Sequence, residues 1–419
     1  MKISNTVFKN LSLYFVSSII TSIVGILINP ILASKLSHMD YAIIGYYASF
    51  ATLLTPIVSI SLQSYYARNY YRVDEKMRNR MYNTIMSISF VLGFIFLVLF
   101  ILVYYLYHTL YVSSIPFSPY AVLSFFPIYL TSFYNLYLMD LRMSNKALKY
   151  ATVTILNSFL LALLSILLVY CIEWGAVGRL LAILANALLF LVYVVHTRHV
   201  KICFDISIVK ESLSFSWPLV ISGILSFFFI GIDRAMLEKI HDNYNLGLYN
   251  VGLQISTYLA IFGTVLLQTF DPDLYKFTST NQHKKVVLTA LGIVLLTLIP
   301  NMFFIVISEP LIDFLTAGRY VDAAEYSNIL CIKNVMMTFA FVMSGILIGY
   351  GHSKYELGNR ILGSVIAIIT YYILIGNYGF YGAAWGQSIT WLFMGIISLL
   401  CLIFIRKKND KIKCNCTCL

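Results

Sequence analysis

Long runs of apolar residues, each about the length of a bilayer crossing, recur along the whole chain. An α-helix needs about 20 mostly apolar residues to cross the hydrocarbon core of a membrane. The pattern predicts twelve such helices. They are residues 11–34, 41–67, 82–107, 118–139, 150–172, 175–195, 213–237, 246–270, 286–308, 326–350, 361–375 and 382–405.

Two of the apolar stretches are too long for a single crossing, and proline and glycine residues divide them. The stretch 81–139 contains no Asp, Glu, Lys or Arg, and Pro116 and Pro119 split it because proline lacks a backbone donor and interrupts a helix. The stretch 361–405 divides at Gly376 and Gly379, which are typical of a turn. The connections between spans are short and leave no room for a separate soluble domain.

Composition supports the membrane interpretation. Hydrophobic residues make up 60% of the 419 residues and charged residues only 11%, whereas soluble domains are about a quarter charged. This balance excludes a soluble enzyme, a nucleic-acid-binding domain and a secreted disulfide scaffold. The seven cysteines show no CxxC spacing, so the sequence indicates no metal site and no redox centre.

The net charge of +11 is a topology signal, because Lys and Arg accumulate on the cytoplasmic side of membrane proteins. If the N-terminus is cytoplasmic, 23 of the 29 Lys and Arg residues fall in cytoplasmic segments and 4 fall outside. The other two, Arg179 and Lys333, lie within spans. We therefore expect a multi-pass protein with both termini in the cytoplasm, contacts with membrane lipids, and no nucleic-acid partner.

Similar landmarks recur in the two halves of the chain at offsets of 204, 208 and 207 residues. The pairs are Lys35 with Lys239, Lys146 with Lys354, and Gly175 with Gly382. Transporters are often built from such repeats. We predict an all-α fold with an N-lobe at 1–200 and a C-lobe at 201–408, each of six helices, followed by a cytoplasmic tail at 409–419. Because six is an even number, the lobes should be related by a pseudo-two-fold axis along the membrane normal around a central cavity.

Several stretches carry a family resemblance. They are residues 30–46, 175–179, 213–220 together with Asp233 and Arg234, 247–275, and 314–323. With them the chain resembles the oligosaccharide flippases of the polysaccharide biosynthesis family, in the multidrug/oligosaccharidyl-lipid/polysaccharide exporter superfamily. The resemblance implies export of undecaprenyl-pyrophosphate-linked oligosaccharides across the bacterial inner membrane for O-antigen of lipopolysaccharide, capsule or exopolysaccharide. It implies no cofactor. A glycan polymerase and a chain-length regulator are candidate partners.

Ionisable residues inside spans are costly and are candidates for function. Asp233 and Arg234 lie near the outer end of one span and either line the cavity or bridge to a neighbouring helix. Adjacent helical residues point about 100° apart, so we do not expect these two to pair with each other. Lys333 lies about 10 Å into its span. It either binds a phosphate or anionic sugar, which we favour, or extends to the membrane interface.

Two further basic residues are weaker candidates for substrate binding. Arg179, one turn into its span, could bind phosphate through its guanidinium, but an interfacial anchor is the favoured interpretation. Lys35, at the outer mouth, has the pattern of a solvated loop charge. We keep both as candidate cavity residues.

Two other functions remain open. A multidrug or cation antiporter of the same superfamily should depend on carboxylates deep in the spans, and Asp233 is the main candidate. A glycan polymerase or membrane glycosyltransferase usually needs a large outer loop with catalytic residues, and the loop 309–325 is short. No Walker A motif indicates ATP hydrolysis. We expect a transport protein and not an enzyme.

Overall fold

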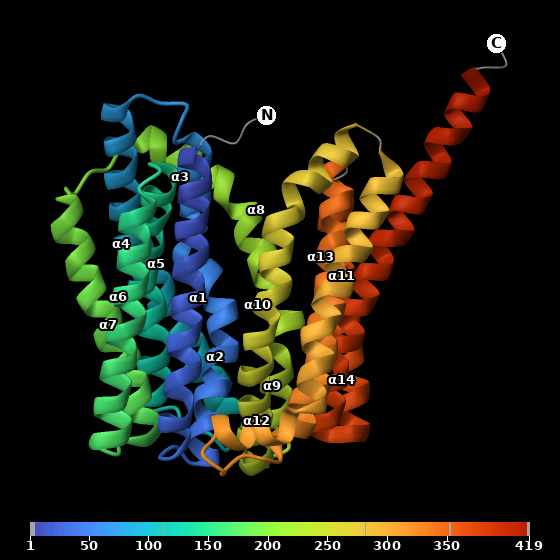
Figure 1. Cartoon of the computed structure of the whole chain (residues 1–419). Helices are drawn as coiled ribbons and strands as arrows, with labels where there is room; N and C mark the ends of the chain where they lie inside the picture. The colour runs from blue at the N-terminus through green and yellow to red at the C-terminus, as the bar shows by residue number, and fades with distance from the viewer. Residues whose placement is uncertain (1–4, 112, 281, 352, 417–419) are drawn as a thin grey trace. The chain divides into compact units, whose positions relative to one another are not determined.

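The computed structural model describes residues 5–111, 113–280, 282–351 and 353–416. Within those ranges every regular element is a helix, and the helices of each part run side by side (Figure 1). The side chain of Lys354 and those of the predicted tail 409–419 lie outside the described part. The backbone of that tail continues α14 as far as Cys416.

The helices follow the predicted spans closely. The first nine elements are α1 (Asn5–Ala33), α2 (His38–Ser59), α3 (Leu62–Asn69), α4 (Glu75–Leu110), α5 (Tyr120–Met143), α6 (Ala147–Ser165), the π-helical turn η1 (Ile166–Cys171), α7 (Gly175–Arg198) and α8 (Ile206–Ile230). The remaining elements are α9 (Ile232–Glu238), α10 (Asn243–Ser279), α11 (His283–Val306), α12 (Ser308–Leu315), α13 (Ala323–Gly349) and α14 (Ser353–Cys416).

Eleven helical stretches in the described ranges are long and apolar enough to cross a membrane. The last, Leu357–Ile405, has 49 residues and would be about 70 Å long if straight, more than twice the hydrocarbon thickness. Its backbone is non-helical at Gly379, where φ is 54° and ψ is −126°. It therefore provides two crossings. Twelve spans result, and both the predicted number and the predicted division near Gly379 are confirmed.

Two spans that the sequence predicts as continuous are interrupted. The span 41–67 breaks between α2 and α3 at Ile60 and Ser61, where φ is 49° and 50°. There the Ser59 hydroxyl accepts the Ser61 amide at 3.3 Å, a local bond that replaces a helical one. The span 213–237 breaks at Gly231, between α8 and α9. In α1, by contrast, the helix continues through Pro30. Proline is tolerated inside membrane-spanning helices because neighbouring groups satisfy the backbone carbonyl that it frees.

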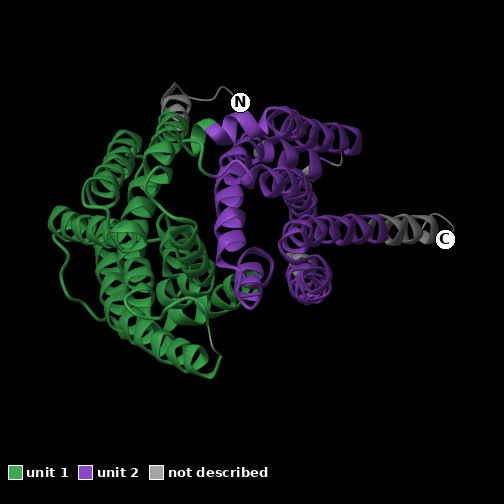
Figure 2. Cartoon of the chain, turned by 90° about the horizontal axis from the view of Figure 1, so that it is seen from below, with its two compact units in different colours: residues 1–227, 314–319 green, residues 228–313, 320–419 purple. Residues whose placement is uncertain are grey.

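The chain forms two compact units (Figure 2). Unit 1 comprises residues 1–227 and 314–319, and unit 2 comprises residues 228–313 and 320–419. Most of α8 therefore belongs to unit 1, whereas the predicted lobe boundary lies before it, at residue 200. Spatial compactness and a sequence repeat are different properties, so the two-lobe repeat stays a prediction.

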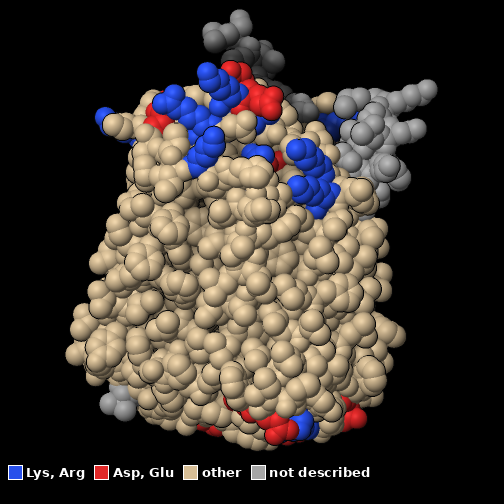
Figure 3. All heavy atoms as spheres, turned by 90° about the vertical axis from the view of Figure 1, so that its left-hand side faces the viewer, with Lys and Arg blue, Asp and Glu red and all other residues tan. Residues whose placement is uncertain are grey.

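In unit 1, α2 packs on α4, α5 and α7, while α1 packs on α6 and η1. The interior contains many tyrosines, including Tyr46, Tyr47 and Tyr66. On the face in Figure 3, Lys and Arg side chains gather at the upper end, where α1 begins in Figure 1. A broad band below them carries no charged side chain. This distribution is typical of a surface that faces lipid.

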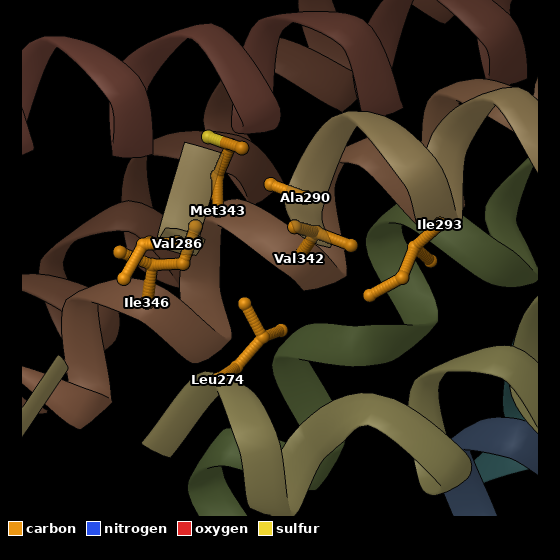
Figure 4. Close-up of a cluster of buried hydrophobic side chains, with 7 residues drawn as sticks. All are labelled: Leu274, Val286, Ala290, Ile293, Val342, Met343 and Ile346. Atoms are coloured by element: carbon orange, nitrogen blue, oxygen red, sulfur yellow. The ribbon is translucent and has the colours of Figure 1, made fainter. Parts of the chain in front are cut away.

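Unit 2 is built on α10, α11 and α13, which pack against one another, and α13 also packs along α14. One buried apolar cluster joins the first three helices (Figure 4). Its members are Leu274, Val286, Ala290, Ile293, Val342, Met343 and Ile346. This packing holds α10, α11 and α13 together.

Candidate functional site

Three of the five predicted site residues belong to one buried cluster in unit 2. Asp233 and Arg234 lie in the short helix α9, and Lys333 lies in α13. Their exposed fractions are 0%, 7% and 6% respectively. Charges are rarely buried this deeply in an apolar surrounding unless they are compensated or used.

Helices α10 and α14 hold the Asp233 carboxylate in place. The Tyr249 hydroxyl donates to Asp233 Oδ2 at 2.6 Å, and Gln387 Nε2 donates to the same oxygen at 2.7 Å. Gln387 Nε2 also lies 3.1 Å from the Tyr249 hydroxyl oxygen, to which it donates. One carboxylate oxygen thus connects α9, α10 and α14.

Arg234 does pair with Asp233, which corrects our expectation for these neighbours. Arg234 Nε lies 3.7 Å from Asp233 Oδ1, and Arg234 Nη2 donates to the carbonyl of Ile230 at 2.9 Å. The expectation considered only the directions of the Cβ atoms. The arginine side chain is long enough to turn back toward its own helix start, which brings the guanidinium beside the carboxylate.

Lys333 differs from the other charges because its ammonium has no hydrogen-bond acceptor among the described residues. Its electrostatic neighbours are Asp233, which attracts it, and Arg234, which repels it. If Lys333 extended to the membrane interface, its side chain would be exposed. The side chain is buried, which disfavours that interpretation. Asp233, Arg234 and Lys333 together carry two positive charges and one negative charge, and Glu238, a second acid of α9, is also buried.

Arg179 and Lys35 lie in unit 1 and have partners there. The Arg179 guanidinium donates to the Ser165 hydroxyl. Lys35 forms an ion pair with Glu173, outside the membrane-spanning segments. This hydrogen bond raises the pKa of Lys35 and lowers the pKa of Glu173. Their roles in substrate binding stay predictions.

Tyr249 and Gln387 are site residues that the sequence analysis did not select. Gln387 could have been selected from the sequence, because a side-chain amide within an apolar span needs a hydrogen-bond partner. Tyr249 gives no such signal, because it is one of 32 tyrosines and aromatic residues are common in membrane proteins. Among the described residues, no group of three or more His, Cys, Asp or Glu side chains is placed to hold a metal.

Comparisons with known proteins identify the family. A sequence profile described as polysaccharide biosynthesis protein matches residues 7–272, more than half of the chain. The Lsg locus putative protein 1 of Haemophilus influenzae is 25% identical over 375 residues, which cover 86% of this chain and 90% of that protein. The capsular polysaccharide biosynthesis protein CapF of Staphylococcus aureus is 26% identical over 45% of this chain and 48% of its own.

Two solved structures share the fold. One is a multidrug resistance MATE family transporter of the MOP superfamily in an inward-facing conformation, with a TM-score of 0.70 and 16% identity over 94% of this chain and 95% of that one. The other is the lipid II flippase MurJ in an inward closed conformation, also with a TM-score of 0.70, and with 15% identity over 93% of this chain and 87% of that one. The chain is thus a multi-pass membrane protein that belongs to the polysaccharide biosynthesis protein family.

Proposed function

We propose that the protein is a flippase that moves undecaprenyl-pyrophosphate-linked oligosaccharide units across the bacterial inner membrane, with both termini in the cytoplasm. Membership of the polysaccharide biosynthesis family supports a role in glycan assembly. Twelve apolar spans support translocation through the bilayer. The protein carries the lipid-linked substrate and does not alter it chemically.

The observation that carries this proposal is the buried side chain of Lys333. Its ammonium has no hydrogen-bond acceptor among the described residues. An isolated charge in an apolar interior is strongly unfavourable, so a site of this kind gains most from a ligand of opposite charge. Lysine binds phosphate as a compact point charge. We therefore assign Lys333 to the pyrophosphate of the substrate.

Asp233 is the resident counter-ion in this scheme. Tyr249 and Gln387 fix its Oδ2, so its position does not depend on substrate. It attracts Lys333 electrostatically. A pyrophosphate brings more negative charge than one carboxylate and would attract Lys333 more strongly.

The cluster argues against the antiporter alternative. A cation that approaches Asp233 also meets the positive charges of Arg234 and Lys333, which repel it. An anionic substrate experiences the opposite field. Residues 309–325 comprise most of α12, a short connection and the start of α13, and they form no large outer domain, which disfavours a polymerase.

The test is export in cells that lack the gene and carry a variant. We expect Lys333→Ala to abolish surface glycan and to accumulate lipid-linked units in the cytoplasmic leaflet, with Lys333→Arg retaining part of the export. Lys284→Ala is the matched control, because it removes one exposed lysine from unit 2. Normal export by Lys333→Ala would contradict the proposal. Loss of polymer while single units still reach the outer leaflet would indicate a polymerase instead.

A further inference from the structure

The connection between α12 and α13 leaves unit 2 and returns to it. Residues 314–319 belong to unit 1, although the chain before and after them belongs to unit 2 (Figure 2). We call this six-residue segment the strap. Its backbone folds back on itself at Ala317 and Gly318, where φ is 51° and 77°. The contacts within unit 1 show what holds it there.

Arg319, the last residue of the strap, binds the end of α1. Its Nη1 donates to three backbone carbonyls, those of Ala33 at 3.0 Å, Ser34 at 2.8 Å and Leu36 at 3.0 Å. The last carbonyls of a helix have no partner within the helix and carry partial negative charge. A cation at this position therefore satisfies the end of α1 by both hydrogen bonding and electrostatics.

A second contact holds the start of the strap. Asn29, inside α1, donates from Nδ2 to the carbonyl of Leu315 at 2.9 Å, and both residues are buried. Thr316, between the two anchors, is fully buried. The strap is thus fixed at two points, and its middle is covered.

The α1–α2 connection and the first turn of α2 also contact the start of α7. Asp40 accepts the Ala176 amide on Oδ1 at 2.7 Å and so satisfies the start of α7, where a Cβ on Gly175 would come within 2.7 Å of the same oxygen. Lys35 pairs with Glu173 just before α7. Three stretches of the family resemblance, residues 30–46, 175–179 and 314–323, therefore meet at one place.

We propose that the strap is a releasable latch, with Arg319 as its lock, and that its attachment to the end of α1 controls the conformational cycle. A segment that begins and ends in unit 2 but binds unit 1 must follow any movement between them or detach. The two N–H groups of Arg319 Nη1 are shared among three carbonyls, so loss of this one nitrogen from its place breaks all three contacts together. The role in transport rests on the proposed function, whereas the attachment itself does not.

The test measures exposure of the strap in the purified protein, reconstituted in nanodiscs. A variant without native cysteines carries Thr316→Cys, and a maleimide labels that thiol only when the strap detaches. We expect Arg319→Gln to raise the labelling rate about tenfold, because it removes charge-assisted bonds. Arg319→Lys should raise it less, since an ammonium keeps the positive charge and offers three N–H donors. Arg72→Gln, which removes an exposed arginine from unit 1, should leave the rate unchanged.

Asn29→Leu provides a second way to loosen the strap while Arg319 stays intact, and size-exclusion profiles show whether each variant is folded. Unchanged labelling in both Arg319→Gln and Asn29→Leu would overturn the latch. Surface glycan gives the second readout. It should fall in Arg319→Gln and recover in Arg319→Lys, and faster labelling with unchanged glycan would overturn the control of transport. Normal glycan in Lys333→Ala would instead reject the substrate site and leave the labelling result valid.

Discussion

At the scale of single residues, the Asp233 carboxylate and the Lys333 ammonium depend on each other. Both are buried, and Asp233 attracts Lys333 electrostatically, whereas Arg234, 3.7 Å from Asp233, repels it. Removing one partner of a buried pair leaves an uncompensated charge, which typically costs about 3–5 kcal/mol, whereas removing both can be nearly neutral. The pair therefore predicts a strongly non-additive response to substitution.

We expect Asp233→Asn to lower the thermal stability of the purified protein clearly, because Lys333 and Arg234 would lose the negative charge of Asp233. The double variant Asp233→Asn with Lys333→Met should recover much of that loss. Thermal unfolding in detergent measures both, with Lys333→Met alone completing the cycle. Additive losses in the double variant would show that the two residues do not interact.

The Lys35–Glu173 pair gives a prediction for pH. The pKa of Glu173 lies below its usual 4.5, so its contribution to stability is present above that value and is lost as the pH falls through the lowered pKa. The pKa of Lys35 lies above its usual 10.5, so its contribution is lost only as the pH rises through the raised pKa. We expect the melting temperatures of wild type and Glu173→Gln to differ by a constant amount between about pH 6 and 9. The difference should shrink below about pH 4. A difference that changes steadily across neutral pH would contradict this account.

At the scale of elements, backbone conformation explains where the sequence predictions succeed. Gly379 adopts φ 54° and ψ −126°, a conformation that residues with a Cβ rarely adopt, so a glycine-rich site in a long apolar stretch correctly indicates a break. The break at Ile60 and Ser61 contains neither glycine nor proline. It depends on local and tertiary contacts, and no sequence pattern revealed it.

Gly379 offers a direct test of this reasoning. A Cβ at Gly379 would meet no atom within 4 Å, so Gly379→Ala should act through backbone strain alone. We expect a destabilisation of about 1–3 kcal/mol, seen as a lower melting temperature. Gly376→Ala is the matched control, because Gly376 also has free space and has no positive φ. Equal effects of the two substitutions would show that the conformation at Gly379 is not required.

The candidate site, too, could be predicted from the sequence only in part. Asp233, Arg234 and Lys333 could be selected from the sequence because charge inside an apolar span has a large energetic cost. Their mutual arrangement could not, because it depends on the packing of α9, α10, α13 and α14. Tyr249 became recognisable only through its hydrogen bond to Asp233.

At the scale of the whole molecule, crossing number and charge distribution predict topology. Twelve crossings would place both ends of the chain on the same side of the membrane, and from the excess of Lys and Arg we propose that this side is the cytoplasm. We expect a C-terminal green fluorescent protein fusion to fluoresce and a C-terminal alkaline phosphatase fusion to be inactive. Fusions after Glu173 and after His241, in predicted outer connections, should show the reverse. Active phosphatase at the C-terminus would reject the topology.

The central claim is that the buried cation Lys333 binds the pyrophosphate of a lipid-linked glycan while the protein moves that lipid across the membrane. Its most direct test is translocation of an undecaprenyl-pyrophosphate-linked oligosaccharide in proteoliposomes that contain only this protein. We expect wild type and Lys284→Ala to translocate the lipid at similar rates, and Lys333→Ala to be slower by at least about tenfold. Equal rates for Lys333→Ala and wild type, or no translocation by wild type above protein-free vesicles, would contradict the account.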